Sequence, residues 1–276
     1  MLTEVHVPED VPAAVGLIAA GATILGGGTS LMPRLNDYGS PPTELVSLRR
    51  TGLAGIHADG SAVTIGATTT LAQLEHDARI KFLNPVVRSI ASVPVRNLAT
   101  VAGNLFVPQP YGDLAVALVA LDARATVAAQ PSGGSQPSGG GQPGPSRQVS
   151  VELLAGTAAL VTAVTFELPR PGAFKYLKAA RRRFNSASLV TVAATITEEG
   201  GVVSAARVAL GGVSDRIVRA TAVEAALLGR PLTTETVEDA ARAGLEQIEP
   251  RDDAYGSAWY RRRVFPVHLR RALLGR

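Results

Sequence analysis

The chain has 276 residues, of which 46% are hydrophobic and only 4% aromatic, so Ala, Val and Leu must build most of its core. It contains no cysteine, which excludes disulfides, thiolate zinc sites and iron–sulfur clusters ligated by this chain. The net charge is +4, but the clearest basic cluster, Arg181 to Arg183, belongs to no known nucleic-acid-binding motif, so we expect no nucleic-acid partner.

Targeting signals are not visible in the sequence. The N-terminal stretch MLTEVHVPED lacks the basic start and the apolar run of a signal peptide. No apolar run approaches the roughly 18 residues that a membrane-spanning helix needs. We therefore expect a cytoplasmic protein, and a position at the inner face of the membrane stays open.

The first half of the chain alternates between helical and strand-like patterns. Asp10 has the residue type of a helix N-cap, with Pro12 in the first turn. Helices are expected at 10–20, 71–80, 84–92 and 113–122, and strands at 22–25, 44–48, 63–67, 125–129 and 159–168. Residues 130–147 are almost entirely Pro, Ser, Gly and Gln, which predicts a disordered loop between neighbouring strands.

The second half has strands first and helices afterwards. Two apolar runs, 187–197 and 202–210, are joined by Glu-Glu-Gly-Gly, which predicts a hairpin. Helices are expected at 221–228, 236–248 and 257–274, and Pro266 should kink or break the last one. This order indicates an α+β domain, and we place the domains at 1–170 and 171–276.

Three glycines in a row, Gly26 to Gly28, follow the expected strand at 22–25. Glycines let the backbone approach a ligand closely and turn successive N–H groups toward an anion. A Rossmann fingerprint would need glycine in place of Leu31, and a P-loop would need a lysine that this loop lacks. The residues alone leave a structural turn and a phosphate site equally open.

Two further polar stretches interrupt the apolar pattern. The first, RNLATVAGNL, offers the hydroxyl group of Thr100, close backbone approach at Gly103 and the amide group of Asn104. The second, PYGDL, contains Asp113. This aspartate either caps the following helix or accepts hydrogen bonds from ribityl or ribose hydroxyl groups.

In order along the chain, these stretches resemble the FAD-binding medium subunit of the xanthine dehydrogenase and carbon monoxide dehydrogenase family of molybdenum hydroxylases. The other matching pieces are GGGTSLMPRL, ELVSLRRTGLAGI, IGATTTLAQLE, ALVALDA, YLKAARR, NSASLV, ARVALGGV and SAWYRRRVFPVHLRRAL. The resemblance covers nearly the whole chain except the loop at 130–147. It implies an α+β fold, with a two-subdomain FAD-binding domain of the vanillyl-alcohol-oxidase (PCMH) type before a smaller α+β C-terminal domain.

The resemblance also implies particular FAD contacts, and the absence of cysteine favours non-covalent binding. The glycine loop and the Thr-x-x-Gly-Asn segment would hold the pyrophosphate, and Asp113 would contact the ribityl region. Tyr176 or Lys178 would lie near the isoalloxazine ring, and Thr68 and Thr69 would line the same cleft. The expected cofactor-binding residues are Ile24, Leu25, Gly26, Gly27, Gly28, Thr29, Ser30, Leu31, Thr68, Thr100, Ala102, Gly103, Asn104, Asp113, Tyr176 and Lys178.

The chain departs from the family pattern at two places near this site. Ala102 stands where the family has the first glycine of Gly-Gly-Asn, which requires a negative φ at that residue. The stretch 153–169 is shorter than usual, with Leu153-Leu154 in place of an aromatic pair. The second departure leaves the surroundings of the flavin ring open.

The function that the resemblance implies is electron transfer by an oxidoreductase subunit. Molybdopterin and 2Fe-2S clusters are expected only on a large and a small partner subunit, within a dimer of heterotrimers. Electrons would pass from those clusters through FAD to an acceptor such as NAD or a quinone. A free-standing FAD oxidoreductase and a flavin-free assembly protein stay open as alternatives. We expect no catalytic residue here and, because the four histidines are scattered, no metal site.

Overall fold

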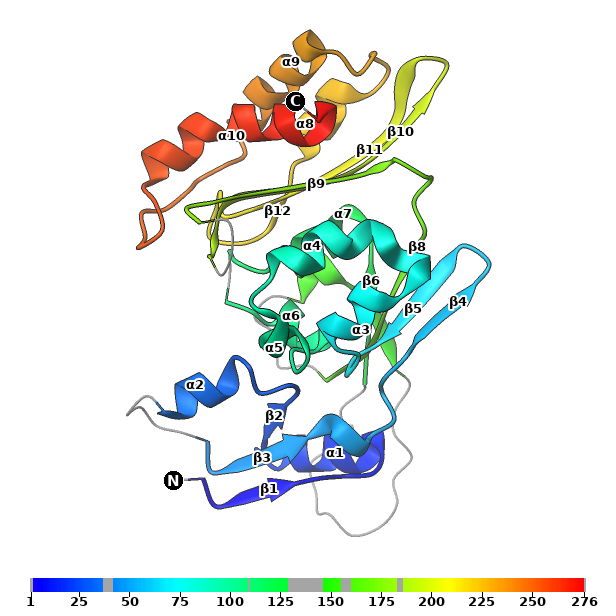
Figure 1. Ribbon diagram of the computed structural model, residues 1–276, viewed down its shortest axis with the longest axis vertical. Helices are drawn as coiled ribbons and strands as arrows, with labels where there is room; N and C mark the ends of the chain where they lie inside the picture. The colour runs from blue at the N-terminus through cyan, green and yellow to red at the C-terminus, as the bar shows by residue number, and fades with distance from the viewer. Residues whose placement is uncertain are drawn as a thin grey trace.

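The computed structural model describes residues 2–36, 42–108, 110–128, 146–154, 160–182 and 186–275. Within them, three sheets follow one another along the longest axis of the molecule (Figure 1). Residues 130–145 of the expected loop lie outside the described part of the chain. The expected end of the loop was wrong, because Arg147 already belongs to a strand.

The N-terminal layer is a small parallel sheet in the order β1-β3-β2. Its strands are β1 (Glu4–His6), β2 (Thr23–Leu25) and β3 (Glu44–Ser47), followed by a 3₁₀ turn at Leu48–Arg50. Helix α1 (Val11–Ala19) connects β1 to β2 and packs Ala14 and Val15 against Val46. The side chain of Asp10 caps this helix, as expected, by accepting a 2.8 Å hydrogen bond from the N–H of Ala13.

The middle layer is an antiparallel sheet in the order β4-β5-β8-β6-β7. Its strands are β4 (Ile56–Asp59), β5 (Ala62–Gly66), β6 (Arg124–Val127), β7 (Arg147–Ser150) and β8 (Val161–Glu167). Two short 3₁₀ turns, Ala78–Leu83 and Val151–Leu153, accompany it. Its helices are α3 (Leu71–His76), α4 (Asn84–Ser89), α5 (Val93–Arg96), α6 (Val101–Leu105) and α7 (Asp113–Ala120).

The helix expected at 71–80 is divided in the structure, because Asp77 has extended backbone angles. The carboxylate of Asp77 instead accepts a 2.9 Å hydrogen bond from the N–H of Arg79 and begins the 3₁₀ turn. Helix α7 is buried from Leu114 to Ala120 and lies between the middle sheet and the C-terminal sheet (Figure 1). The main core therefore includes Ala193 and Ala209 of the C-terminal sheet.

The C-terminal layer is an antiparallel sheet in the order β12-β11-β10-β9, covered on one face by α8, α9 and α10 (Figure 1). Its strands are β9 (Phe174–Ala180), β10 (Ser188–Glu199), β11 (Val202–Gly211) and β12 (Val218–Arg219). Its helices are α8 (Thr221–Leu227), α9 (Thr234–Gly244) and α10 (Ala258–Leu274). Gly200 and Gly201 both have positive φ, as the tight turn of the expected hairpin requires.

Two expectations for this layer need correction. Helix α10 continues through Pro266, so the helix does not break there, and the kink that was the other expected outcome stays a prediction. Helix α9 begins two residues before the expected Thr236, because the side chain of Thr233 caps it. The expected domain boundary near residue 170 stays a prediction; it falls on the connection between β8 and β9, which belong to different sheets. Within the described residues, no helix combines the length and the apolar character needed to cross a bilayer.

Candidate cofactor-binding site

Two adjoining cavities are lined by residues of neighbouring layers of the structure. The first, of about 540 Å³, is lined by residues of the N-terminal and middle layers. The second, of about 440 Å³, is lined by residues of the middle and C-terminal layers. The residues that line both cavities are Ile90, Ala91, Val95, Asn104 and Val107. These volumes are typical of small-molecule sites, and the shared wall makes the two cavities parts of one site.

The glycine loop lines the first cavity directly after β2. Most of the expected loop residues lie there, namely Ile24, Gly26, Gly27, Gly28, Thr29, Ser30 and Leu31. Leu25 does not line the cavity. In the part of the chain that the structure describes, the backbone N–H groups of Gly27, Gly28, Thr29 and Ser30 donate to no other residue. They remain available to an anion.

Packing inside the protein already explains why Gly27 is a glycine. A Cβ atom at Gly27 would lie 1.7 Å from the carbonyl oxygen of Leu98, and one at Gly26 would lie 2.9 Å from the Oγ1 atom of Thr100. The glycine loop and the segment before α6 are therefore in direct backbone contact. The residues alone left a structural turn and a phosphate site open at this loop, and at Gly27 the neighbouring chain segment requires glycine.

The Thr-x-x-Gly-Asn segment forms α6, with Thr100 as its N-cap. The first backbone N–H groups of this helix are already used: Val101 donates to the carbonyl of Thr69, Ala102 to that of Ala67, and Gly103 to the Oγ1 atom of Thr100. This segment therefore faces the first cavity chiefly with side chains. Ala102 lies inside a helix, so its φ is negative and the missing glycine is tolerated.

Asn104 lies where the two cavities meet. Its Nδ2 atom donates a 2.9 Å hydrogen bond to the carbonyl of Thr100, which fixes the amide group against its own helix. The residue is only 8% exposed, yet it lines both cavities. An amide that is held in this way can offer its remaining donor and acceptor to a ligand that passes from one cavity to the other.

The two expected threonines lie in different places. Thr68 lines the first cavity. Thr69 does not; its hydroxyl group donates to the carbonyl of Gly55 and accepts from the N–H of the same residue, both at 3.0 Å. Thr69 is only 1% exposed, so we assign it a structural role in joining two loops.

Asp113 and Lys178 line the second cavity together. The Oδ2 atom of Asp113 lies 2.7 Å from the Nζ atom of Lys178, and its Oδ1 atom accepts a 2.7 Å hydrogen bond from Thr191. Lys178 also donates to the carbonyl of Ser89 at 3.0 Å. Asp113 does not cap α7 with its side chain, since Gly112 holds the cap position. Its carboxylate instead joins α7 to the C-terminal sheet at the cavity wall.

Tyr176 lies behind this wall and lines neither cavity. Its hydroxyl group lies 2.9 Å from the Oγ atom of Ser89. Burial, followed by the negative charge of Asp113, raises the pKa of Tyr176 well above 10, so the phenol stays neutral. Of the two residues that the sequence offered for the flavin end, the structure brings only Lys178 to the cavity.

Ala91 was not predicted from the sequence, yet it lines both cavities with a φ of 47°. This left-handed conformation is costly for a residue with a Cβ atom. It is held by Arg96, which is 7% exposed and donates from Nη1 to the carbonyls of Ile90 and Ala91 at 3.1 and 3.0 Å. Arg96 also pairs with Glu75 at 3.3 Å. A buried arginine thus shapes the shared wall from outside the site.

Arg34 of α2 (Leu31–Asn36) lines the first cavity and was not predicted from the sequence. Among the described residues that line the first cavity, it alone has a charged side chain. As far as the structure describes the chain, the cavity therefore combines backbone N–H groups without an acceptor, one guanidinium group and hydroxyl groups, while Ile90, Val95 and Val107 supply apolar walls. These residues fit a dinucleotide whose pyrophosphate lies against the glycine loop. In the described residues, no group of three or more His, Asp or Glu side chains could hold a metal ion.

Comparison with known proteins shows which family the chain resembles. Residues 2–136 match the FAD-binding domain in molybdopterin dehydrogenase, and residues 175–275 match the C-terminal domain of the CO dehydrogenase flavoprotein. The glyceraldehyde dehydrogenase medium chain of Sulfolobus acidocaldarius is 30% identical over 88% of this chain and 86% of its own length. The carbon monoxide dehydrogenase medium chain of Hydrogenophaga pseudoflava is 28% identical over 98% of this chain and 95% of its own length.

Solved structures extend the likeness from sequence to fold. A carbon monoxide dehydrogenase structure from Hydrogenophaga pseudoflava, lacking the Mo-pyranopterin moiety of its cofactor, contains a chain that superimposes with a TM-score of 0.89. That chain is 29% identical, and the match covers 99% of this chain and 96% of the other. The two-part fold expected from the sequence is thereby confirmed. The chain belongs to the FAD-binding medium subunits of the molybdenum hydroxylase family, which are subunits of oxidoreductase complexes.

Proposed function

We propose that FAD lies across both cavities, with its pyrophosphate against the glycine loop and its flavin end in the second cavity. The observation that carries this proposal is the set of N–H groups from Gly27 to Ser30, which have no acceptor in the described part of the chain. Charge-assisted hydrogen bonds from such groups to a phosphate contribute on the order of 1.5–3 kcal/mol each. Arg34 adds a formal positive charge at the same cavity.

The same proposal assigns roles to the other lining residues. Thr68, Thr100, Ala102 and Gly103 line the pyrophosphate side, and Asn104 contacts the ligand where the cavities meet. Asp113 and Lys178 face the flavin end as one hydrogen-bonded pair. Tyr176 does not touch the ligand in this proposal; it supports Ser89, whose carbonyl accepts from Lys178.

We further propose that the chain is the electron-transfer subunit of a complex. When bound, FAD supplies two-electron redox chemistry. The chain's own residues bind the cofactor and orient it. Electrons would come from 2Fe-2S clusters on a small partner subunit and leave to an acceptor such as NAD or a quinone. The organic substrate would react at a molybdopterin-binding large subunit, in a dimer of heterotrimers.

Cofactor identity and partners can be tested on one purified sample. We expect the protein to release FAD, and not FMN, when it is denatured and filtered. We also expect co-purifying subunits that contain molybdenum and iron, and flavin reduction by the substrate only while those subunits are present. Covalently retained flavin would contradict the non-covalent site.

The two alternatives make different predictions in the same experiment. A free-standing FAD oxidoreductase would catalyse substrate-dependent dye reduction without a molybdenum-containing partner. A flavin-free assembly protein would contain no flavin and would not bind FAD on reconstitution. Neither alternative accounts for both the unpaired glycine-loop N–H groups and the family membership.

A further inference from the structure

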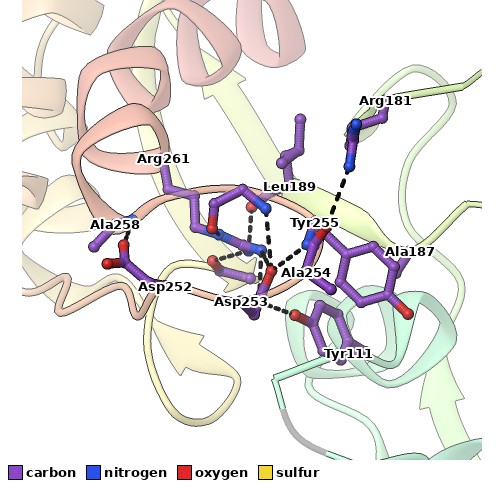
Figure 2. A network of polar contacts seen from close by, with 12 residues as sticks. Tyr111, Arg181, Ala187, Leu189, Asp252, Asp253, Ala254, Tyr255, Ala258 and Arg261 are labelled. Carbon is purple, nitrogen blue, oxygen red and sulfur yellow. Dashed lines mark hydrogen bonds and ion pairs between the residues drawn. The ribbon is translucent and has the colours of Figure 1, made fainter.

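Tyr111 lines the second cavity, and its side chain contacts residues near the C-terminal end of the chain. It lies in the connection between α6 and α7, and its hydroxyl group donates to the Oδ2 atom of Asp253. Its ring meets that of Tyr255 edge-on, with centroids 5.4 Å apart (Figure 2). Asp253 and Tyr255 both belong to the loop between α9 and α10.

Asp253 is itself held firmly by the C-terminal layer. It accepts hydrogen bonds from the N–H groups of Tyr255 and Gly256 at 2.7 and 3.1 Å. The Nη2 atom of Arg261 donates to both of its oxygens, at 2.8 and 2.7 Å (Figure 2). Although burial opposes it, the hydrogen bond from Tyr111, the backbone donors and the Arg261 charge together lower the pKa of Asp253 below its usual 3.8.

Arg261 connects this carboxylate to the rim of the second cavity. The side chain is 1% exposed, and its Nη1 atom donates to the carbonyls of Leu189 and Gly212 at 2.8 and 2.6 Å. Leu189 directly follows Ser188, which lines the cavity. The N–H of Gly212 donates to the carbonyl of Pro110, next to Tyr111, at 3.2 Å. The buried guanidinium group of Arg261 thus contacts the segments at Leu189 and Gly212, which lie next to residues that line the cavity. Through Asp253 it also holds Tyr111.

The bond between Tyr111 and Asp253 is not needed to neutralise a buried charge. Asp253 already forms an ion pair with Arg261, whose Nη2 atom donates charge-assisted hydrogen bonds to both carboxylate oxygens. A missing phenol would leave that pair intact. The physical consequence of the bond is therefore the position of the Tyr111 ring. Burial, and after it the hydrogen bond to Asp253, raises the pKa of Tyr111 to about 12, so the donor proton is present at ordinary pH.

We propose that Tyr111 contacts the flavin end of FAD and that Asp253 and Arg261 are positioning residues that hold its ring against the second cavity. The C-terminal domain thereby acts on the cofactor through a residue of the FAD-binding domain. This inference rests on the proposed placement of the flavin end in the second cavity. It adds a cofactor contact, Tyr111, to those expected from the family resemblance.

The test distinguishes binding of the flavin half of FAD from binding of its ADP half. Dissociation constants are measured for FAD and for ADP, the fragment that lacks the flavin end, on the full-length apo-protein. Tyr111→Phe keeps the ring and loses the hydroxyl group, Asp253→Asn keeps the shape and loses the charge, and Tyr111→Ala removes the ring. Tyr260→Phe, an exposed tyrosine of α10, is the matched control. Circular dichroism confirms that each variant is folded.

We expect Tyr111→Phe to weaken FAD binding roughly five-fold, which corresponds to one hydrogen bond, and Tyr111→Ala to weaken it about twenty-fold or more. ADP affinity should change by less than about two-fold, a difference too small to count as a lost contact. The visible circular dichroism of bound FAD should change in both variants and stay as in the unmodified protein for Tyr260→Phe. In the Asp253→Asn background, Tyr111→Phe should have almost no further effect, because the two residues act through one bond.

Two results would overturn the inference alone: unchanged FAD affinity in the folded Tyr111 variants, or a parallel loss of ADP affinity. Additive effects of Tyr111→Phe and Asp253→Asn would overturn the positioning role of Asp253. If Tyr111→Ala does not fold, the phenylalanine variant and the double-mutant cycle still decide. Failure of the unmodified protein to bind FAD would instead overturn the proposed function, and this inference with it.

Discussion

The Nζ atom of Lys178 lies 2.7 Å from the Oδ2 atom of Asp113, and the two side chains are only 11% and 10% exposed. Removing one partner of a buried pair leaves the other charge without compensation. We expect Lys178→Met to lower the free energy of unfolding by about 3–5 kcal/mol in urea denaturation and to weaken FAD binding. Lys175→Met, on the same strand, is the control because Lys175 forms no ion pair within the described residues. Equal effects of the two variants would contradict a specific role for the pair.

Gly27→Ala should destabilise the protein, because its Cβ atom would lie 1.7 Å from the Leu98 carbonyl oxygen and no side-chain rotation can relieve a backbone clash. We expect a loss of about 1–3 kcal/mol, as for overpacked sites, together with release of FAD. Gly16→Ala is the matched control: its Cβ atom meets nothing within 4 Å, and alanine should stabilise α1. Thermal unfolding measures both. If the Gly27→Ala protein unfolds at the same temperature as the unmodified protein, the close contact between the glycine loop and the segment at Leu98 is dispensable.

Arg34→Gln should weaken FAD binding by removing the charged side chain that lines the first cavity. Because Arg34 is exposed, we expect only about a five- to ten-fold effect at low salt, and a smaller one at high ionic strength. Arg49→Gln replaces an exposed arginine that does not line this cavity. Titrations of both variants at two salt concentrations give the comparison. A salt-independent effect would argue against direct attraction to the pyrophosphate.

The segment between β6 and β7 should be removable. Val127 and Arg147 are register partners in an antiparallel pair, so a short turn can replace residues 129–145. Loop length itself contributes little, about 0.6 kcal/mol per doubling. We expect the melting temperature to change by no more than a few degrees and FAD to stay bound. A deletion extended to Ser150 would remove β7 and should be clearly destabilising; similar losses from both deletions would show that the segment itself is structural.

His268 should make stability depend on pH. Burial, and then the positive charge of Arg271, lowers its pKa below 6.5. The unfolded chain therefore binds the proton more readily, so this contribution to stability falls as the pH drops below 6.5 and levels off below the lowered pKa. His268→Gln should flatten the dependence of melting temperature on pH between about 7 and 5, the window set by an unfolded histidine. His57→Gln changes an exposed histidine and should leave the dependence of melting temperature on pH unchanged.

Local sequence patterns predicted most helices and strands, because apolar periodicity and caps act over a few residues. The cap at Asp10 and the hairpin turn at Gly200 and Gly201 are of this kind. Strand β9 was not predicted, because its sequence FKYLKAA contains two lysines and shows no clear alternation of apolar and polar residues. The glycine loop was found because its composition is unusual.

The second cavity could not be assembled from the sequence because its contacts join distant residues. Asp113 and Lys178 are separated by 65 positions, and Tyr111 and Asp253 by 142. Nor could the sequence show the left-handed conformation of Ala91, since alanine rarely adopts it and nothing local requires it. Such relationships follow from the way the sheets pack, and only the folded chain reveals them.

Strand β8 is the last strand of the middle sheet in the sequence and the central one in space, between β5 and β6. The match to the FAD-binding family ends at residue 136, before this strand begins. A fragment cut at that point would lack β7 as well as β8. It would leave one edge of β5 and both edges of β6 unpaired, each a template for association with another chain. Expression of the FAD-binding part alone therefore has to extend through Glu167, and during synthesis this sheet cannot close until that residue has emerged.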